Sequence, residues 1–395
     1  MHRFSNNNWV AAEADPKDFL YEPLHFIRSH CEEDCTADST TQIWDVAFEP
    51  GQKDVVATCG GRYLCVFSVS SGELLMKYTH KNKGHELYSL SWTSLGCGNL
   101  LASGSACGEV RLYRPAREVA FYSWTHKKGV AVNAVEFHTS QPSWLFTATN
   151  ESIISLWDIR EPNPPDYSRC RHVQLLKMVA DMGDVYSMAW VEEEQWVMVG
   201  TMKGLVGWKA MADKVKEDKF PRHKPIMVEF SLPGMSSSTP YVDSVCSLGG
   251  GLVAAKCVGL GKISVFRANF REMTNQTRYY KVEVLAQFGW QKTDNFYMNI
   301  GGSAQLGMMG CGDDQGSTWV YRLPACLAEE AADEEDHEEQ NILPIGRLAW
   351  PDLGKHSAKG QTMLDKVAFS PCGQYIVAVT NTNIVAIWRR EKKNL

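Results

Sequence analysis

The sequence lacks the features that mark several large classes of protein. Its 395 residues contain no run of the roughly 18 consecutive apolar residues that a membrane-spanning helix needs, and the start, MHRFSNNNW, has no apolar stretch that would serve as a secretory signal. Basic residues are not in excess, because 40 Lys and Arg stand against 46 Asp and Glu, a net charge of −6. Binding of nucleic acid through a general basic field is therefore disfavoured, and a basic peptide is the better-matched partner.

Cysteine is too sparse for a scaffold held by disulfides, since a chain of this length has only 12. Cys31 and Cys35 stand close together in CEEDC, but no second Cys or His pair follows at zinc-ribbon spacing. The sequence therefore predicts no metal site and no cofactor. Free thiols in apolar runs pack like small hydrophobic side chains, which favours the cell interior. Five cysteines lie in such runs: Cys59, Cys65, Cys246, Cys257 and Cys311.

The common catalytic motifs are also missing. The chain has no G-x-S-x-G, no H-E-x-x-H and no phosphate-binding Walker loop. Its Gly-rich strings, such as GSACGE and CGDDQG, stand between apolar runs, where Gly permits the tight turn of a hairpin. The sequence therefore predicts that the protein is not an enzyme.

What the sequence does contain is a pattern repeated seven times. Each copy has a short apolar alternation, a run rich in small residues and Gly, and a run that ends on a large aromatic residue. A further apolar run, such as ELLMKY or HVQLLKM, follows most copies and predicts a fourth, outer strand. The spacing of about 44 to 67 residues fits a WD repeat of about 40–45 residues with insertions. The copies begin at Ile43, Leu87, Val132, Val185, Val242, Phe296 and Leu364.

Seven such units predict a closed ring. A four-stranded sheet cannot bury both of its faces alone, so the copies pack face to face around a channel. We predict an all-β, seven-bladed WD-repeat β-propeller over residues 21–395, as one domain after an N-terminal tail of residues 1–20. The early strand PLHFIRSH, residues 23–30, is expected to complete the last blade. Residues 329–341 are predicted to be an acidic loop, either a solvated charge run or a docking strip for a basic partner.

One position in the repeat carries the candidate site. It lies four residues before the large residue that closes the first strand, which places it at the mouth of the channel. Aromatic faces there attract an alkylated ammonium by about 0.5–2 kcal/mol each. The competing interpretation is that the rings only pack between blades. The aromatic members are Trp44, Tyr88, Tyr186, Phe296 and its neighbour Tyr297, and the polar members of this channel rim are Asn133, Asp243 and Asp365.

Several segments resemble the WD-repeat half of the origin-recognition-complex-associated family, also called the leucine-rich-repeat and WD-repeat-containing protein one family. The resemblance runs from about Tyr21 to Trp388, and PLHFIRSH and NTNIVAIW are its most specific parts. It implies a nuclear protein of chromatin that works with the origin recognition complex and heterochromatin proteins, and that is linked to repressive trimethyl-lysine marks on histone tails. The leucine-rich repeats of the family are absent from this sequence, so functions that depend on them are not implied. The segments are PLHFIRSH, TQIWDVAFEP, VATCGG, LYSLSWTSL, LFTATNESIISLWDI, GCGDDQGSTWVYRL and NTNIVAIW.

A weaker similarity, in LYSLSWT, YVDSV and FYMNI, links the chain to the embryonic ectoderm development protein, the propeller subunit of a Polycomb methyltransferase complex. Matched motif by motif, it implies a methyl-lysine cage of Trp44, Tyr88 and Phe296, with Tyr297 as the alternative ring. Tyr186 has no counterpart and stays a rim residue. Three hypotheses remain open: a reader of methylated histone tails that scaffolds origin or heterochromatin proteins, a Polycomb-type subunit that binds a methyltransferase partner, and a scaffold without a cage.

Overall fold

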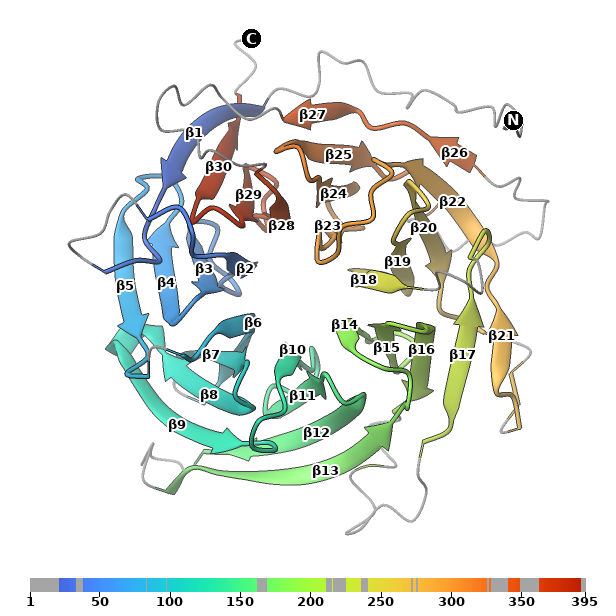
Figure 1. Ribbon diagram of the computed structural model, residues 1–395, viewed down its shortest axis with the longest axis horizontal. Coiled ribbons are helices and arrows are strands. Elements are labelled where there is room, and N and C mark those ends of the chain that lie inside the picture. Colours follow the sequence, from blue (N-terminus) through green and yellow to red (C-terminus); the bar gives the residue numbers. More distant parts are fainter. Residues whose placement is uncertain are drawn as a thin grey trace.

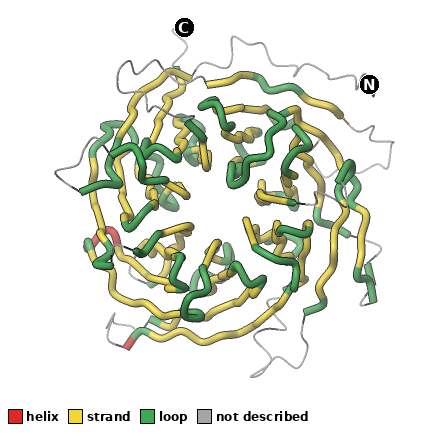
Figure 2. Tube along the Cα trace, in the orientation of Figure 1, coloured by secondary structure: helices red, strands yellow, loops and turns green. Residues whose placement is uncertain are grey.

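Seven separate sheets stand around one axis, like the blades of a propeller (Figure 1). In the described part of the chain the tube trace consists of strands and loops, with short helical turns such as Pro115–Arg117 (Figure 2). The predicted all-β, seven-bladed β-propeller is therefore confirmed. Among the residues described, no helix has the length and apolar character needed to cross a membrane. The computed structural model describes residues 21–32, 38–82, 84–96, 98–161, 169–210, 215, 225–235, 241–270, 273–274, 276–324, 327, 340–348 and 362–391.

The first four blades follow the chain from the axis outward. The first contains β2 (Ile43–Phe48), β3 (Val55–Gly60), β4 (Tyr63–Ser68) and β5 (Leu74–Thr79). The second contains β6 (Leu87–Leu95), β7 (Gly98–Ser105), β8 (Glu109–Arg114) and β9 (Val119–Thr125). The third contains β10 (Val132–Phe137), β11 (Trp144–Thr149), β12 (Ile153–Arg160) and β13 (Arg171–Val179). The fourth contains β14 (Val185–Val191), β15 (Trp196–Thr201), β16 (Gly204–Lys209), β17 (Met227–Ser231) and, parallel to β17, β21 (Tyr279–Lys281).

The last three blades are less regular. The fifth contains β18 (Val242–Gly249), β19 (Leu252–Cys257), β20 (Lys262–Arg267), β22 (Val284–Gly289) and the parallel β26 (Gln340–Ile342). The sixth contains β23 (Gly301–Ser303), β24 (Met308–Gly312), β25 (Thr318–Arg322) and β27 (Gly346–Leu348). The seventh contains β28 (Leu364–Phe369), β29 (Tyr375–Thr380), β30 (Val385–Arg390) and β1 (Tyr21–Ile27). The parallel strands β21 and β26 are not predicted from the sequence, because three residues carry too little alternation to be recognised.

The two ends of the described chain meet in the seventh blade. Strand β1 pairs antiparallel with β30, from Tyr21 opposite Arg390 to Ile27 opposite Val385. The ring of Phe26 stands edge-on to Trp388 of β30, with centroids 5.8 Å apart. An early segment thus supplies the outer strand of the last blade, and closure of the ring depends on this strand pair.

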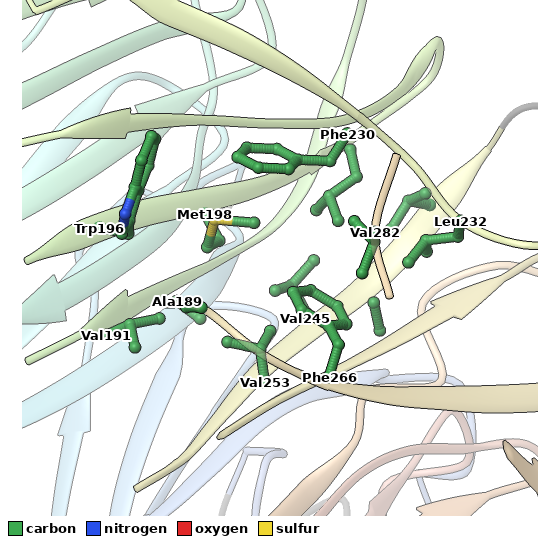
Figure 3. Close-up of a cluster of buried hydrophobic side chains, with 14 of the residues drawn as sticks. Ala189, Val191, Trp196, Met198, Phe230, Leu232, Val245, Val253, Phe266 and Val282 are labelled. Atoms are coloured by element: carbon green, nitrogen blue, oxygen red, sulfur yellow. The ribbon is translucent and has the colours of Figure 1, made fainter. Parts of the chain in front are cut away.

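The hydrophobic core lies between the blades. Each of seven buried clusters takes its side chains from two neighbouring blades. Figure 3 shows the cluster in which Trp196 and Phe230 of the fourth blade meet Val253 and Phe266 of the fifth. Because every blade buries both faces, the loss of one blade would expose two such clusters. The aromatic residues that end the third run of each repeat are all buried here: Phe67, Tyr113, Trp157, Trp208, Phe266, Tyr321 and Trp388.

A second set of contacts, which we call the inner belt, joins the inner strands of neighbouring blades. A side chain on one blade accepts the backbone N–H of the next, which satisfies groups at the free edge of the inner strand. The ion pair of Lys366 with Asp45, at 2.7 Å, links the seventh blade to the first. The backbone bonds run from Leu90 to Asp45 (2.9 Å), Val135 to Ser89 (3.2 Å), Trp190 to Glu136 (3.0 Å), Val245 to Ser187 (2.7 Å) and Ile300 to Ser244 (2.9 Å).

The structure differs from the sequence prediction in the sixth blade. FYMNI was expected to begin its first strand, but β23 starts only at Gly301. The reason is local, since Tyr297 has a φ of +67°, a left-handed conformation that an extended strand cannot contain. The N-terminal tail 1–20 and residues 329–339 of the acidic loop lie outside the described residues, and residues 340–341 belong to β26.

Candidate functional site

The candidate residues share a bulge near the start of the inner strands. In six blades the pairing of the inner strand with its neighbour skips one residue, the second of the strand. A bulged residue is left out of the ladder, and its side chain is re-aimed. The inner belt joins equivalent positions, so the inner strands run in the same direction and their bulges share one end of the axis. The skipped residues are Trp44, Tyr88, Asn133, Tyr186, Asp243 and Asp365.

Aromatic rings from the bulges meet residues of the sixth blade. Trp44 stands edge-on to Tyr88, with centroids 5.4 Å apart and planes at 80°. Trp44 also stands edge-on to Tyr297, at 5.5 Å and 81°. The rings of Tyr88 and Tyr297 are thus nearly perpendicular to the ring of Trp44. All three rings are half-buried, so part of each remains open to solvent.

Tyr297 also belongs to a second group of rings. It stands edge-on to Tyr186 at 5.4 Å and 85°, and Tyr186 contacts Phe296 at 5.4 Å. Phe296 in turn contacts Tyr241, again at 5.4 Å. Six rings therefore form one continuous set, which we call the aromatic cluster: Trp44, Tyr88, Tyr186, Tyr241, Phe296 and Tyr297.

This arrangement refines the predicted cage. The resemblance named Phe296 as the third ring and Tyr297 as its alternative, and it is Tyr297 that contacts Trp44. Tyr186, assigned to the rim, contacts both residues of the sixth blade. Tyr241 was not singled out, although it stands in YVDSV, one residue before β18, and that motif was part of the Polycomb similarity.

Acidic groups surround the tyrosines of the aromatic cluster. The hydroxyl of Tyr88 donates to Glu86 at 3.3 Å, and burial together with this carboxylate raises the pKa of Tyr88. Burial, with neighbouring Tyr297 and the exposed Asp184, raises the pKa of Tyr186 to about 12. Burial, with Asp184 again, raises the pKa of Tyr297. The phenols therefore stay neutral, and the nearby carboxylates favour a positively charged ligand.

The polar members of the predicted rim have structural partners. Asn133 is half-buried and donates to the carbonyl of Val185 in the next blade at 2.8 Å. Asp243 and Asp365 are fully buried, whereas an open rim was expected. Asp243 pairs with the equally buried Lys256 at 2.6 Å, and Asp365 accepts from the side chain of Gln42 at 3.0 Å. Burial raises the pKa of both aspartates. Of the eight predicted residues, Asn133 and the five aromatic ones are half-buried, and the two aspartates are enclosed.

Solved structures share this architecture. A chain from a humanized mutant of the Chaetomium thermophilum Polycomb Repressive Complex 2 matches 95% of this chain and 98% of its own length, with a TM-score of 0.70 and 14% identity. Another structure of this complex contains histone H3 with a trimethylated lysine, and there the match covers 95% and 99% with a TM-score of 0.68 and 13% identity. At these identities the likeness establishes the fold alone.

The sequence comparisons point to one family. The chain is 29% identical to leucine-rich repeat and WD repeat-containing protein 1 of Xenopus tropicalis and 29% identical to that of Homo sapiens. Both alignments cover 93% of this chain but only 55% and 58% of the relatives, so the chain spans a little over half their length. These relatives are named as WD-repeat proteins, and nothing in their names indicates an enzymatic activity. Because the model of the leucine-rich repeat and WD repeat-containing protein 1 WD domain matches residues 12–391, the chain belongs to that family.

Proposed function

We propose that the protein is a non-enzymatic, nuclear chromatin-binding propeller that recognises repressive trimethyl-lysine on histone tails through the aromatic cluster. It would also scaffold origin-recognition or heterochromatin proteins. The observation that carries this proposal is the meeting of Trp44, Tyr88 and Tyr297 at one end of the axis, with half-buried rings at near right angles. The solved Polycomb structure of the same fold that contains trimethylated histone H3 supports the same class of partner.

The chemistry of a trimethylammonium suits such rings. The group carries a full positive charge but has no N–H to donate. Carboxylates and carbonyls therefore form no hydrogen bond with it, and only the attraction of charge remains. Aromatic faces attract it electrostatically, at about 0.5–2 kcal/mol per ring when water is excluded. Two or three rings therefore supply about 1–6 kcal/mol of attraction for the group. The carboxylates of Glu86 and Asp184 add an attraction for the basic residues of a histone tail.

Two other functions remain as alternatives. The fold similarity to Polycomb chains favours a subunit that holds a methyltransferase partner against one face of the ring. A scaffold without a cage is favoured by the ring contacts themselves, because edge-on pairs at 5.4–5.5 Å also stabilise packing between blades.

A peptide titration tests the cage. We expect a fluorescently labelled histone H3 peptide carrying a trimethylated lysine to bind at least about tenfold more tightly than its unmodified form. Trp44→Ala and Tyr88→Ala should abolish this difference, whereas Tyr279→Ala, which removes a ring that is 62% exposed on β21, should leave it intact. A peptide in which a carbon atom replaces the charged nitrogen should bind like the unmodified one. Equal binding of all peptides, with folded variants, would exclude the cage.

A second measurement separates the partners. Affinity purification of the tagged chain from nuclear extract, followed by mass spectrometry, should recover origin-recognition or heterochromatin proteins under the main proposal. Recovery of a lysine methyltransferase in stoichiometric amount would instead favour the Polycomb-type subunit. The Trp44→Ala variant should keep its protein partners in either case, because the rings are assigned to the peptide and not to the scaffold.

A further inference from the structure

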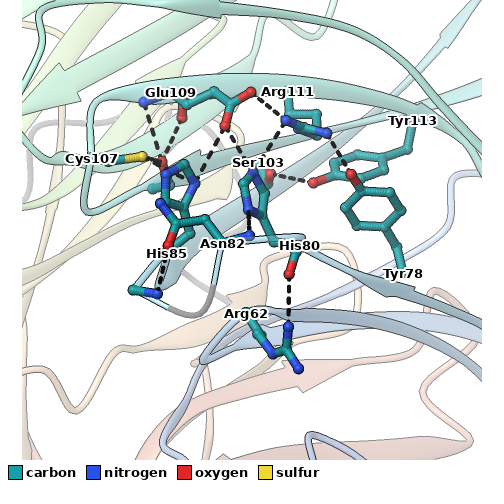
Figure 4. Close-up of polar contacts among 12 residues, drawn as sticks. Arg62, Tyr78, His80, Asn82, His85, Ser103, Cys107, Glu109, Arg111 and Tyr113 are labelled. Carbon is teal, nitrogen blue, oxygen red and sulfur yellow. Dashed lines mark hydrogen bonds and ion pairs between the residues drawn. The ribbon is translucent and has the colours of Figure 1, made fainter.

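A second polar cluster lies at the junction of the first two blades (Figure 4). His80 directly follows β5, the outer strand of the first blade, and His85 stands two residues before β6, the inner strand of the second. Glu109 opens β8, and Cys107 lies in the turn before it. The chain thus crosses from one blade to the next between the two histidines, and both side chains turn toward the same carboxylate.

The ligand atoms are close to one another. His80 Nε2 lies 3.1 Å and His85 Nδ1 lies 3.5 Å from the same oxygen, Oε2 of Glu109. All three atoms lie within 4.8 Å of one another. Tetrahedral ligands bound to zinc at about 2.0–2.1 Å stand roughly 3.3 Å apart, so two of these spacings match those around a shared ion. The side chains are 9%, 17% and 14% exposed, which leaves them largely desolvated yet within reach of a small ion.

We infer that His80, His85 and Glu109 bind a divalent transition-metal ion of the zinc type, with Cys107 as the fourth ligand. The Cys107 sulfur lies 3.2 Å from His85 Nδ1 but outside the group of atoms that lie within 4.8 Å of one another, so its side chain would turn toward the ion. Two imidazoles, one carboxylate and one thiolate are the ligands that zinc, cobalt and nickel prefer, whereas calcium and magnesium take oxygen ligands. This site is separate from the aromatic cluster and does not depend on the function proposed for it.

Arg111 competes with the ion. Its guanidinium donates to the other carboxylate oxygen of Glu109 and also lies 3.2 Å from His80 Nε2. Its positive charge lies beside the position that the ion would take, so it opposes metal binding. His80 Nδ1 accepts the N–H of Asn82 at 3.2 Å, and this bond is lost when Nε2 takes the ion and Nδ1 holds the proton. In the metal-free state Nε2 therefore carries the proton and donates to Glu109, and metal binding at Nε2 moves the proton to Nδ1.

The metal state would hold the connection between the first two blades. The connection leads directly into Glu86 and Tyr88. A bound ion would therefore fix the backbone just before Tyr88, a member of the aromatic cluster. In the metal-free state the same connection is held by the hydrogen bonds of His80 with Glu109 and of His85 with Cys107.

Calorimetric titration of the whole chain with Zn²⁺, after treatment with a chelator, tests the inference. We expect one ion per chain in a saturable isotherm, and at least about tenfold weaker binding in Glu109→Gln and in His85→Asn. His25→Asn, a histidine of β1 outside the cluster, is the matched control and should bind as the wild type does. With Co²⁺ as the probe, the sulfur-to-metal absorption band should be present in the wild type and absent in Cys107→Ser.

Arg111→Met separates a metal site from a purely structural network. Removing this cation should tighten Zn²⁺ binding by about tenfold, because the guanidinium charge no longer repels the ion. A hydrogen-bond network with no metal function predicts no gain. Circular dichroism checks each variant, and if Glu109→Gln fails to fold, Cys107→Ser and Arg111→Met still decide the question. Absence of a saturable isotherm, or binding that Glu109→Gln and His85→Asn leave unchanged, would overturn the assignment.

Discussion

Glu136 gives a test of how the inner belt responds to pH. This residue of β10 is half-buried, and its Oε2 accepts the N–H of Trp190 in the next blade at 3.0 Å. Burial raises the pKa of Glu136 to about 8, and the negative charge of Asp45 adds to the shift, whereas the Trp190 N–H and the positive charge of Lys366 oppose it. Cys246 also interacts with Glu136. The folded protein therefore carries a proton on Glu136 at neutral pH.

The sign and size of the effect follow from this shift. In the unfolded chain Glu136 releases its proton near pH 4.5, and in the folded chain it does so near pH 8. Between these pH values the folded state therefore binds more protons. The free energy of unfolding therefore falls as the pH rises through this window and is level above it. The full shift corresponds to about 5 kcal/mol. Because the side chain retains some contact with solvent, we expect about 2 kcal/mol.

Glu136→Gln removes the titration and keeps an acceptor oxygen for Trp190. Urea denaturation should give equal free energies of unfolding for variant and wild type near pH 5. Near pH 8.5 the variant should be more stable by about 2 kcal/mol. Glu73→Gln, an exposed carboxylate beside β5, is the control and should follow the wild-type curve at both values. A difference between Glu136→Gln and wild type that does not change with pH would refute the reasoning.

Three further perturbations have expected outcomes that chemical or thermal unfolding can measure. Trp208→Ala empties a fully buried position between two blades and should cost about 3–5 kcal/mol, and a loss below 1 kcal/mol would show that the core between blades is loosely packed. In Gly301→Ala an added Cβ would overlap a backbone carbonyl of β28, so we expect separation of the last two blades and a lower midpoint, whereas Gly84→Ala has room and should be neutral. Lys256→Met leaves a fully buried carboxylate without its partner and should cost about 3–5 kcal/mol, and adding Asp243→Asn should recover most of it.

The sequence contains most of the fold because the repeat is regular. Period-two alternation, glycine turns and the buried aromatic residue of the third strand identify six of the seven blades with their strand order. The first strand of the sixth blade is harder to predict. The left-handed conformation of Tyr297 interrupts a sequence that otherwise has the pattern of a strand, and β23 has only three residues. The parallel strands β21 and β26 lie far along the chain from the strands they join, and no local pattern announces such a pairing.

The candidate site was predictable to the level of the repeat position but not of the contacts. The position four residues before the large residue of the first strand is the bulged one, because the same bulge recurs in six blades. Whether a side chain at that position is exposed depends on the side chains that pack against it. Trp44 stays half-buried, while Asp243 is enclosed by Lys256 from the next strand. The His80, His85 and Glu109 cluster has no sequence signature, because its spacing of five and twenty-four residues matches no common metal motif.

The pairing of β1 with β30 has a mechanical consequence. Tyr21 and Arg390 are direct partners in this pair, so the two ends of the propeller leave it from adjacent points on the outer edge. A pulling force between flanking segments would load the strand pair at one end and unzip its hydrogen bonds one after another, instead of shearing them together. The ring would then open at the seventh blade under a small force while the other six stay packed. Attachments before Tyr21 and after Arg390 would also be neighbours, whatever their size.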